Sequence, residues 1–381
     1  MSRRANNEGS VYKRKDGRWC AVVYLKGERI YLYARTRTEV VTKLKETQKQ
    51  VDQGLTVRGA RYSLGEYLQE WLVFVKSNLR PHTWEGYEQV TRSHIVPHLG
   101  TVRLKDLHPK QIQALYALKE KSLGPSTIRI IHAVLHKSLD QAIKWGLIGR
   151  NPADAVTRPR QNKKEMSVLT PEQAQSLLSH LVGDRYEALY YLALTTGLRR
   201  GELLGLKWDD LDWVTGKLKV QRQLSRLKGE GLVFMQPKTR AGQRSIALGQ
   251  GALEKLRNHA KLQQLERQFF ENRWKDTGLI FTSLIGTPID PKNLSNVHSK
   301  LIKDLGFPPI RFHDLRHTAA TLMLIQGVHP KVVQERLGHS TIEMTLNTYS
   351  HVLPSLQDEA AAKIEELLTP IPVQLNPVER K

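Results

Sequence analysis

The apolar and polar positions of this chain follow two different periods. Residues 9–32 alternate with a period of two, and Asp16-Gly17 and Lys26-Gly27 interrupt the alternation as hairpin-turn pairs. This pattern predicts three short antiparallel strands. From Thr38, a residue that caps helices well, apolar positions recur with helical spacing as far as Gly54. We therefore expect one helix to cover the apolar face of a small sheet.

Helical spacing dominates the next hundred residues. Ser63 followed by Glu66 forms a capping box, which marks the start of an amphipathic helix. Gly100 and Gly124 separate the helical patterns that follow. The expected helices cover residues 64–75, 83–96, 109–121 and 125–145. This part of the chain is predicted to be a helical bundle.

The last two hundred residues mix both periods. Thr170-Pro171 is a helix start, and helices are expected up to Gly197 and again over residues 199–207. Strands are predicted over residues 218–224, 232–236 and 244–248, with Ala241-Gly242 turning the last pair into a hairpin. Later helices are expected over residues 251–273, 293–305, 313–327, 330–337 and 358–368, with a further one capped by Ser340 and Glu343.

Together these patterns predict a mainly α fold with small β elements, of the α+β class. The length of 381 residues suits two or three domains. Residues 150–164 combine prolines with Arg158, Arg160, Lys163 and Lys164 and show almost no apolar periodicity, which is typical of a basic linker. The predicted segments are 1–60 (sheet and helix), 61–155 (helical), 156–168 (linker), 169–370 (mixed) and 371–381 (tail).

The charge of the chain indicates that it binds a polyanion. There are 59 Lys and Arg against 37 Asp and Glu, a net charge of +22, and the pI is near 10.0. Such a balance suits nucleic acid as the partner. The one cysteine, Cys20, cannot form an internal disulfide, and no stretch approaches a membrane span. The N-terminus lacks an apolar signal core, so we expect a bacterial-type cytoplasm.

The basic residues gather at several predicted surfaces. Residues 1–60 hold 14 basic and six acidic residues. Alternation along the third strand predicts a basic and aromatic sheet face, which suits a DNA groove, although a solvated basic face is the alternative. Its members are Arg29, Tyr31, Tyr33, Arg35 and Arg37. Further candidate DNA contacts are Arg129, Lys137, Arg158 and Arg160.

The candidate chemistry lies near the C-terminus. His313 and Arg316 are three residues apart, hence on one helix face, where they can hold an anion. His339 follows Gly338 at a tight corner, and Tyr349 lies about two turns into the next helix by helical geometry. A tyrosine at such a position is most often part of the core, and two helices around a glycine also suit a DNA-binding helix-turn-helix without chemistry.

Two upstream motifs change that balance. Residues 196–202 read TGLRRGE and residues 236–240 read QPKTR. Together with HDLRHT at 313–318, LGH at 337–339 and the Thr348-Tyr349 pair, they resemble the tyrosine recombinase, or phage integrase, family. The positions that match the family's six site residues are Arg199, Lys238, His313, Arg316, His339 and Tyr349. Glu202 matches a supporting acidic residue, whereas Gly242 and Gln243 stand where the family often has a serine.

The resemblance implies site-specific DNA recombination. Tyr349 would attack a phosphodiester and form a 3′-phosphotyrosyl intermediate, without ATP, metal or another cofactor. Arg199 and Arg316 would neutralise the phosphate, since arginine stays protonated and binds two phosphate oxygens with its planar fork. His339 would donate a third hydrogen bond, His313 would exchange a proton with Tyr349, and Lys238 would protonate the leaving 5′ oxygen.

The family also implies partners. These are double-stranded DNA at core and arm sites, three further copies of the chain at synapsis, and a host DNA-bending protein or an excisionase. Its N-terminal arm-binding domain resembles residues 1–60, and its helical core-binding domain resembles residues 61–155. In the family the C-terminal segment docks on a neighbouring protomer, which gives the apolar stripe of residues 358–368 an expected role in assembly.

Three alternatives remain open. An Xer-like resolvase or a type IB topoisomerase would share the tyrosine chemistry, and a non-catalytic regulator would share the charge. Metal-dependent hydrolysis is disfavoured, because His313-x-x-x-His317 lacks the glutamate of a zinc-protease helix. No CxxC pair exists, and no paired carboxylates are expected beside the histidines.

Overall fold

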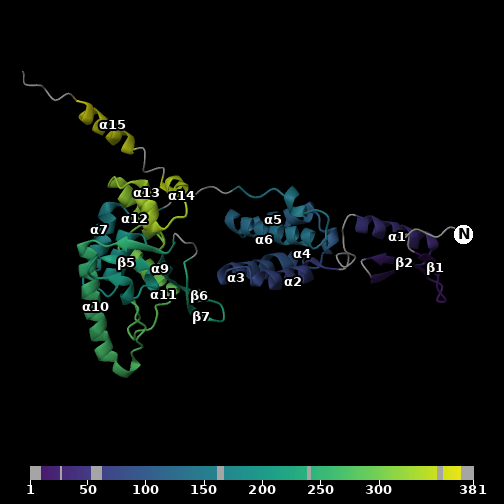
Figure 1. The fold of residues 1–381 in the computed structure, drawn as a ribbon, viewed down its shortest axis with the longest axis horizontal. Helices are drawn as coiled ribbons and strands as arrows, with labels where there is room; N and C mark the ends of the chain where they lie inside the picture. The colour runs from purple at the N-terminus through teal and green to yellow at the C-terminus, as the bar shows by residue number, and fades with distance from the viewer. Residues whose placement is uncertain are drawn as a thin grey trace, which may run out of the picture. The chain divides into compact units, whose positions relative to one another are not determined.

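The computed structural model describes residues 10–25, 28–52, 62–160, 167–237, 242–349 and 355–369. They fall into two compact units, residues 1–163 and 164–381 (Figure 1). Most of these residues are helical, and the strands form small sheets. The predicted α+β class with mainly α content is confirmed.

The N-terminal part is a three-stranded antiparallel sheet with one covering helix. Strands β1 (Ser10–Lys13), β2 (Trp19–Leu25) and β3 (Glu28–Ala34) lie in that order, as predicted. Helix α1 (Arg37–Asp52) packs its apolar residues Val40 and Leu44 on the inner face of the sheet. This separate core is small, which is expected of a unit with so few apolar side chains.

The start of α1 differs from the prediction. The backbone N–H of Glu39 donates to Thr36 Oγ1 at 3.2 Å, so Thr36 rather than Thr38 caps the helix. An earlier cap ends the strand earlier as well. Arg35 and Arg37, which were predicted to extend the basic face of β3, therefore lie beyond the strand, and Arg37 opens α1.

The rest of the first unit is a helical bundle. It comprises α2 (Leu64–Lys76), α3 (Pro81–Val90), α4 (Val96–Leu99), α5 (Pro109–Glu120) and α6 (Pro125–Lys144), with short turns η3 (Leu104–Asp106) and η4 (Pro152–Ala155). The Ser63–Glu66 capping box is present. In Figure 1, α5 and α6 lie over α2 and α3, and Tyr67, Trp71 and Tyr116 are fully buried between the helices.

The helix predicted over residues 83–96 is interrupted. A π-helical turn, η2 (Thr91–Ile95), separates α3 from α4. Pro97 stands in the first turn of α4 and has no N–H to donate to the preceding turn, which favours a local change of helical pitch.

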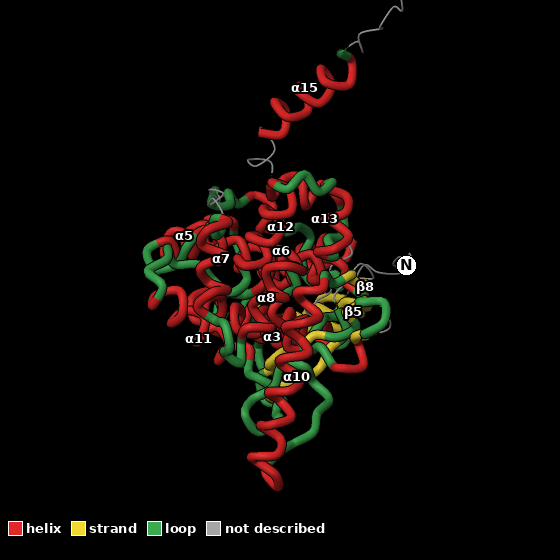
Figure 2. Tube along the Cα trace, turned by 90° about the vertical axis from the view of Figure 1, so that its left-hand side faces the viewer, coloured by secondary structure: helices red, strands yellow, loops and turns green. Residues whose placement is uncertain are grey.

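The second unit contains two small sheets. Strands β4 (Leu211–Asp212), β5 (Lys217–Val220) and β8 (Arg244–Ala247) form one, whereas β6 (Gln223–Leu227) and β7 (Gly231–Met235) form the other. The predicted hairpin between the last two strands is wrong. Gly229 and Gly231, both with positive φ, turn β6 into β7 instead, and β8 pairs with β5 (Figure 2).

Helices surround these sheets. They are α7 (Pro171–His180), α8 (Glu187–Thr196), α9 (Arg200–Leu204), η5 (Trp208–Asp210), α10 (Gln250–Phe270), η7 (Glu271–Arg273), α11 (Pro291–Asp304), α12 (Asp314–Ile325), α13 (Pro330–Leu337), α14 (Ile342–Tyr349) and α15 (Ser355–Leu368). The buried helix α8 is central, because α7, α10 and α12 all pack on it. Helix α14 begins after Thr341, so its first helical residue comes one position later than the predicted Ser340 cap implied.

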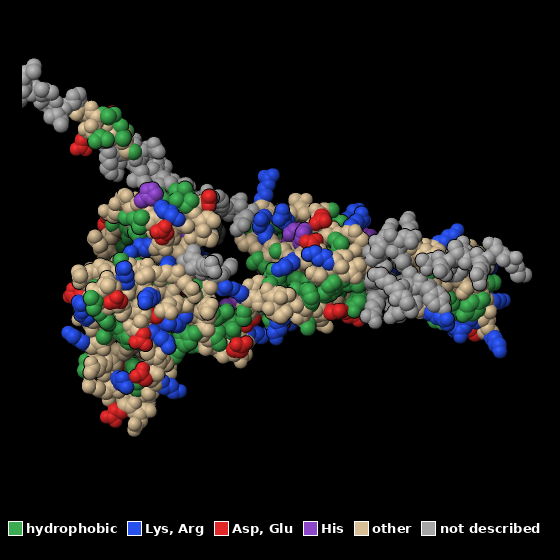
Figure 3. All heavy atoms as spheres, in the orientation of Figure 1, with side chains coloured by type: hydrophobic (Ala, Val, Ile, Leu, Met, Phe, Trp, Pro, Cys, Tyr) green, Lys and Arg blue, Asp and Glu red, His purple; other side chains and the backbone are tan. Residues whose placement is uncertain are grey.

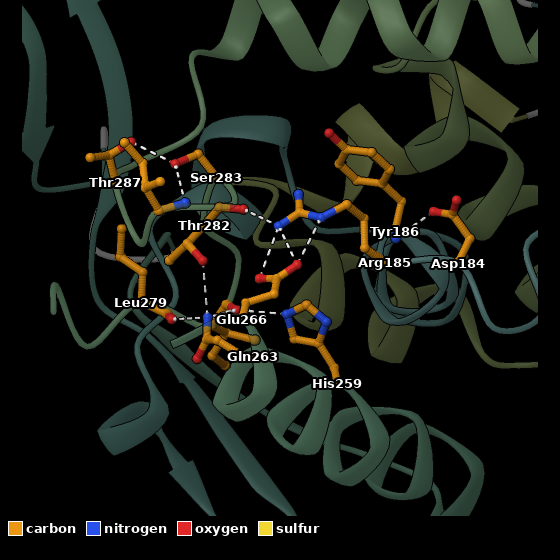
Figure 4. Close-up of polar contacts among 12 residues, drawn as sticks. Asp184, Arg185, Tyr186, His259, Gln263, Glu266, Leu279, Thr282, Ser283 and Thr287 are labelled. Carbon is orange, nitrogen blue, oxygen red and sulfur yellow. Dashed lines mark hydrogen bonds and ion pairs between the residues drawn. The ribbon is translucent and has the colours of Figure 1, made fainter. Parts of the chain in front are cut away.

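A polar network fastens α10 to the loop that follows it (Figure 4). Gln263 Nε2 donates to the carbonyls of Leu279 and Ile280 and to Thr282 Oγ1, at 3.0–3.2 Å. Arg185 donates to Glu266 and to the Thr282 carbonyl. These bonds satisfy the polar groups of a loop that has little regular structure of its own.

Candidate active site

Four of the six predicted site residues come from three tight connections in the second unit. Gly197, in the left-handed conformation with φ of +65°, ends α8 and places Arg199 at the start of α9. Gly338, with φ of +71°, ends α13 and places His339 in the following turn. His313 and Arg316 stand at the start and in the first turn of α12. Glycine is needed at both turns, because other residues are strained at positive φ.

Arg199 is held by a buried carboxylate and a backbone carbonyl. Its Nη1 donates to Glu202 Oε1 at 2.7 Å, and its Nη2 donates to the Gly338 carbonyl at 3.4 Å. Glu202 is 1 % exposed, whereas the Arg199 side chain is 37 % exposed. The guanidinium therefore has one edge fixed by the protein and another open to an incoming anion.

Arg316 approaches the same turns from α12. It is 3 % exposed, and its Nη1 donates to the Gly197 carbonyl at 2.8 Å. Arg316 is thus tied to Gly197, two residues before Arg199, and Arg199 is tied to Gly338, the residue before His339. This brings α8, α9, α12 and the Gly338 turn into one site.

His339 is buried and uncharged at neutral pH. Burial, followed by the nearby Arg316 and Arg199, lowers the pKa of His339 to about 3. Its Nδ1 lies 2.9 Å from Thr345 Oγ1, and its carbonyl accepts from Gln334 Nε2 at 3.1 Å. With Nδ1 bound to the hydroxyl, the other ring nitrogen is left to contact a ligand.

His313 shares this electrostatic environment but keeps its ring exposed. Burial of part of the side chain, then His317 and Arg316, lower the pKa of His313 below the ordinary value. The rings of His313 and His317 meet edge to face, with centroids 5.4 Å apart. A neutral imidazole at this position is able to accept a proton.

Tyr349 is the last residue of α14, the helix that packs on α13 and is fastened to His339 through Thr345. Its side chain lies outside what the structure describes, and so does Lys238 with residues 239–241. The structure therefore brings together Arg199, His313, Arg316 and His339, places the helix of Tyr349 beside them, and leaves Lys238 as a prediction.

Two residues at this site were not predicted from the sequence. Thr345 contacts His339, and Arg244 donates to Glu202 Oε2 at 3.1 Å. Only a weak indication in the sequence pointed to Arg244, which stands two residues before the buried Ile246 and therefore on the same, inward face of its strand. Thr345 had none, because its partner is set by a turn between two helices.

The predicted DNA-contacting residues lie on separate surfaces. Tyr31 and Tyr33 are exposed on β3, and the guanidinium carbon of Arg14 lies 5.2 Å from the ring centre of Tyr33. Arg29 is also exposed on that strand. On the helical bundle, Arg129 and Arg158 line one cavity of about 410 Å³, and Lys137 stacks over the Tyr87 ring. Arg160 is exposed. Lys and Arg side chains are spread over much of the face shown in Figure 3.

The expectation that no paired carboxylates accompany the histidines is wrong for His136. Asp140 and Asp154 lie 3.1 and 2.9 Å from the two ring nitrogens of His136. His136 and Asp140 lie one helical turn apart on α6, whereas Asp154 comes from η4. Only the folded chain brings the second carboxylate to the histidine.

The described helices include none that is long and apolar enough to cross a membrane.

Two arginines and two neutral histidines arranged beside a helix that ends in tyrosine, with a helical bundle preceding them in the chain, define a tyrosine recombinase. The chain belongs to the phage integrase family. The family model described as "Phage integrase family" matches residues 167–355, and that of the "Phage integrase, N-terminal SAM-like domain" matches residues 63–117.

Individual relatives agree with this assignment. A "Tyrosine recombinase XerC-like" protein of Caldanaerobacter subterraneus is 30 % identical, over 88 % of this chain and 91 % of that protein. The "ICEBs1 integrase" of Bacillus subtilis is 26 % identical, over 90 % and 94 %. The structure of the Tn1549 transposon integrase in complex with transposon right-end DNA is similar, with a TM-score of 0.69 and 26 % identity over 80 % of this chain and 99 % of that one. A lambda integrase tetramer bound to a Holliday junction shares the fold, with a TM-score of 0.57, 20 % identity, and coverage of 91 % and 96 %.

Proposed function

We propose that this protein is the integrase of a phage or an integrative and conjugative element, which cuts and rejoins DNA at specific sites. The observation that carries the proposal is the anchoring of Arg316 to Gly197 and of Arg199 to Gly338, which joins two tight turns beside His339 and the helix of Tyr349. This arrangement concentrates fixed positive charge where one phosphate can be held. The names of the relatives, among them an integrative-element integrase and a transposon integrase, support the same role.

The charges at the site suit the cleavage of a phosphodiester. Attack on phosphorus concentrates negative charge on the non-bridging oxygens, and preorganised cations stabilise that transition state. Arg199 offers its open edge, Arg316 a buried charge, and His339 the N–H of a neutral ring. None of these groups must change its protonation state to bind phosphate.

Proton transfer falls to the remaining residues. Tyr349 would be the nucleophile, and attack by its oxygen on phosphorus would expel the 5′ oxygen and leave the 3′ phosphate on the tyrosine. His313, being uncharged, would accept the phenolic proton. Lys238, on the segment between β7 and β8, would supply the proton that the 5′ oxygen takes as it leaves. The 5′ hydroxyl of a second strand can then attack the 3′ phosphate and release the tyrosine, which takes its proton back from His313 while Lys238 accepts the proton of the hydroxyl.

DNA would be held by the other parts of the chain. The exposed Tyr31, Tyr33 and Arg29 of β3, with Arg35 and Arg37 after it, would read arm sites. The phosphates of the core site would be bound by Arg129, Lys137, Arg158 and Arg160. The proposed segments remain 1–60 for arm binding, 61–155 for core binding, 156–168 as a linker, 169–370 for catalysis and 371–381 as a tail. Basic side chains at each of these surfaces predict strong salt dependence of binding.

Assembly on DNA would use the C-terminal helix. Ile364, Leu367 and Leu368 on α15 are 54–77 % exposed, which is unusual for three neighbouring apolar side chains. In a tetramer at synapsis this stripe would pack on a neighbouring copy. A host DNA-bending protein or an excisionase would be a further partner.

An Xer-like resolvase is the second candidate, because one relative carries that name. The N-terminal sheet with exposed Tyr12, Tyr31 and Tyr33 favours an integrase, since a resolvase that acts on core sites alone has no use for a second DNA-binding surface. A type IB topoisomerase or a non-catalytic regulator has less support, given the family of the chain.

A recombination assay tests the proposal. Plasmids carrying the two DNA ends that flank the gene's element are incubated with the protein in EDTA, and joined products are sequenced. We expect exchange at one defined pair of sites without added metal, because the arginines supply the charge. Relaxation of supercoiled DNA without exchange would favour the topoisomerase alternative, and exchange only between two identical chromosomal sites would favour the resolvase.

A further inference from the structure

Arg244 contacts three parts of the site, although it is none of the six residues given a chemical role. It stands at the start of β8, and its side chain is 7 % exposed. Its Nη2 donates to Glu202 Oε2 at 3.1 Å, its Nε to the Arg336 carbonyl at 2.7 Å, and its Nη1 to the Gly242 carbonyl at 3.2 Å. Each nitrogen thus serves a different segment.

The first contact controls the orientation of Arg199. Glu202 is shared between two guanidinium groups, with Oε1 facing Arg199 and Oε2 facing Arg244. Burial acts to raise the pKa of Glu202, but Arg244 and then Arg199 outweigh it, and the pKa is lowered. Glu202 Oε2 also accepts from the backbone N–H of Arg199 at 2.9 Å. Without Arg244 this oxygen would lose one of its two donors, and the carboxylate would be held less firmly against turning both oxygens to the Arg199 guanidinium, the geometry that this pair of groups prefers. That turn would draw the guanidinium away from the phosphate.

The second contact fixes the turn that carries His339. The last carbonyls of α13 have no partners within the helix and must be satisfied from outside. Three side chains donate hydrogen bonds to carbonyls of this turn. Arg244 donates to that of Arg336, Arg199 to that of Gly338, and Gln334 to that of His339. Arg244 and Arg199 therefore hold neighbouring points of one turn.

The third contact lies at the base of the segment that carries Lys238. Pro237 and Gly242 flank this segment, and a Cβ added to Gly242 would lie only 2.6 Å from Pro237 Cβ. The two flanking residues therefore lie at nearly one point. Arg244 binds the Gly242 carbonyl at that point.

We propose that Arg244 is a positioning residue that sets Arg199, His339 and the base of the Lys238 segment relative to one another for strand cleavage. This inference rests on the proposed function. Arginine suits the role because its planar fork reaches three acceptors in fixed directions, whereas lysine has one nitrogen.

A matched control is available in the same unit. Arg185 also pairs with a carboxylate of low exposure, Glu266, and also donates to a backbone carbonyl, that of Thr282 (Figure 4). It contacts the loop after α10 and none of the four candidate catalytic side chains that the structure describes. Loss of Arg185 should therefore lower the stability of the fold, as loss of a half-buried ion pair does, and leave the rate of DNA cleavage unchanged.

The experiment compares Arg244→Lys and Arg244→Gln with Arg185→Lys and Arg185→Gln. Single-turnover cleavage of a nicked core half-site, affinity for the intact half-site and the melting temperature are measured for each. We expect cleavage to fall about tenfold in Arg244→Lys and about 100-fold in Arg244→Gln, the range for small misplacement of catalytic groups. DNA affinity should change by no more than about twofold, since phosphate contacts elsewhere supply most of the binding. The Arg185 variants should cleave at the wild-type rate even where their melting temperatures fall.

A double variant separates positioning from simple destabilisation. If Arg244 acts through Arg199, adding Arg244→Lys to Arg199→Lys should slow cleavage little further, because effects within one unit are not additive. Wild-type cleavage by both Arg244 variants would overturn the inference, as would a loss matched by the Arg185 variants, or a failure of both Arg244 variants to fold. Absence of any cleavage by the wild-type chain would overturn the proposed function itself.

Discussion

At the scale of single residues, the site depends on histidines that stay neutral among arginines. His339 is 7 % exposed, and burial with Arg316 and Arg199 lowers its pKa to about 3. A neutral ring donates one N–H to phosphate and adds no charge to a site that already holds two guanidinium groups. The hydroxyl of Thr345 fixes the orientation of the ring.

This shift of pKa predicts that stability depends on pH. Between about pH 6.5 and pH 3 the unfolded chain protonates His339 and the folded chain does not, so stability is lost as the pH falls through this window. Urea unfolding of the wild type at pH 7 and pH 5 should show lower stability at pH 5. In His339→Asn the difference should shrink. An unchanged difference would mean that His339 titrates alike in both states.

Residues also show what sequence could and could not reveal. Arg199, His313, Arg316 and His339 were predicted because their motifs are local and contiguous. Arg244, Thr345 and the Gly338 carbonyl were missed, because their roles arise from contacts between segments up to 139 positions apart. A sequence pattern specifies which side chain is present but not which carbonyl a turn presents to it.

At the scale of elements, the two left-handed glycines set the geometry of the site. Gly197 has φ of +65°, and its carbonyl accepts from Arg316. A Cβ added there would lie 2.3 Å from Leu337 Cδ2, inside the core of α12 and α13. Both the backbone conformation and the packing therefore require glycine.

Replacement of this glycine tests the point. Gly197→Ala should lower the free energy of unfolding by roughly 2–4 kcal/mol, from strain at positive φ and a clash in a packed core. Denaturant unfolding measures the loss. Gly183→Ala is the matched control, because Gly183 also has positive φ, +78°, but has no atom within 4 Å of an added Cβ. Equal losses in both variants would show that strain alone, without the Leu337 contact, is responsible.

Elements were predicted best where caps are local. The Ser63–Glu66 and Thr170–Gln173 boxes begin helices as expected. The pairing of β7 with β8 was wrong, because two turn signals compete and Gly229 and Gly231 make the tighter hairpin. The π-helical turn before Pro97 was also missed. Such a turn holds one more residue than an α-helical turn, and the apolar pattern is too coarse to show this difference.

At the scale of the whole molecule, the N-terminal sheet, the helical bundle and the second unit each have their own apolar core. The sheet and α1 form one cluster and the helical bundle a second, whereas the second unit has a large third cluster and a small fourth one between α12 and α13. A part with its own core can be removed without exposing the core of another part. The proposed division of labour among the segments can therefore be tested by deletion.

Deletion of residues 1–56 should spare cleavage of a core half-site and weaken recombination between full attachment sites. The reason is that the exposed Tyr31 and Tyr33 and the basic residues around them are lost, whereas the site around Arg199 stays complete. Both activities are measured on the same preparations. An equal loss of the two would mean that the sheet belongs to the catalytic machinery.

The central claim is that Tyr349 carries the DNA strand during the reaction. The most direct measurement incubates the protein with a nicked core half-site in EDTA, digests the product with trypsin and identifies the modified peptide by mass spectrometry. We predict a nucleotide attached through its 3′ phosphate to Tyr349 in the wild type, and no adduct in Tyr349→Phe, which should still bind the half-site with nearly unchanged affinity. An adduct on another residue, or one that persists in Tyr349→Phe at the wild-type level, would contradict the account.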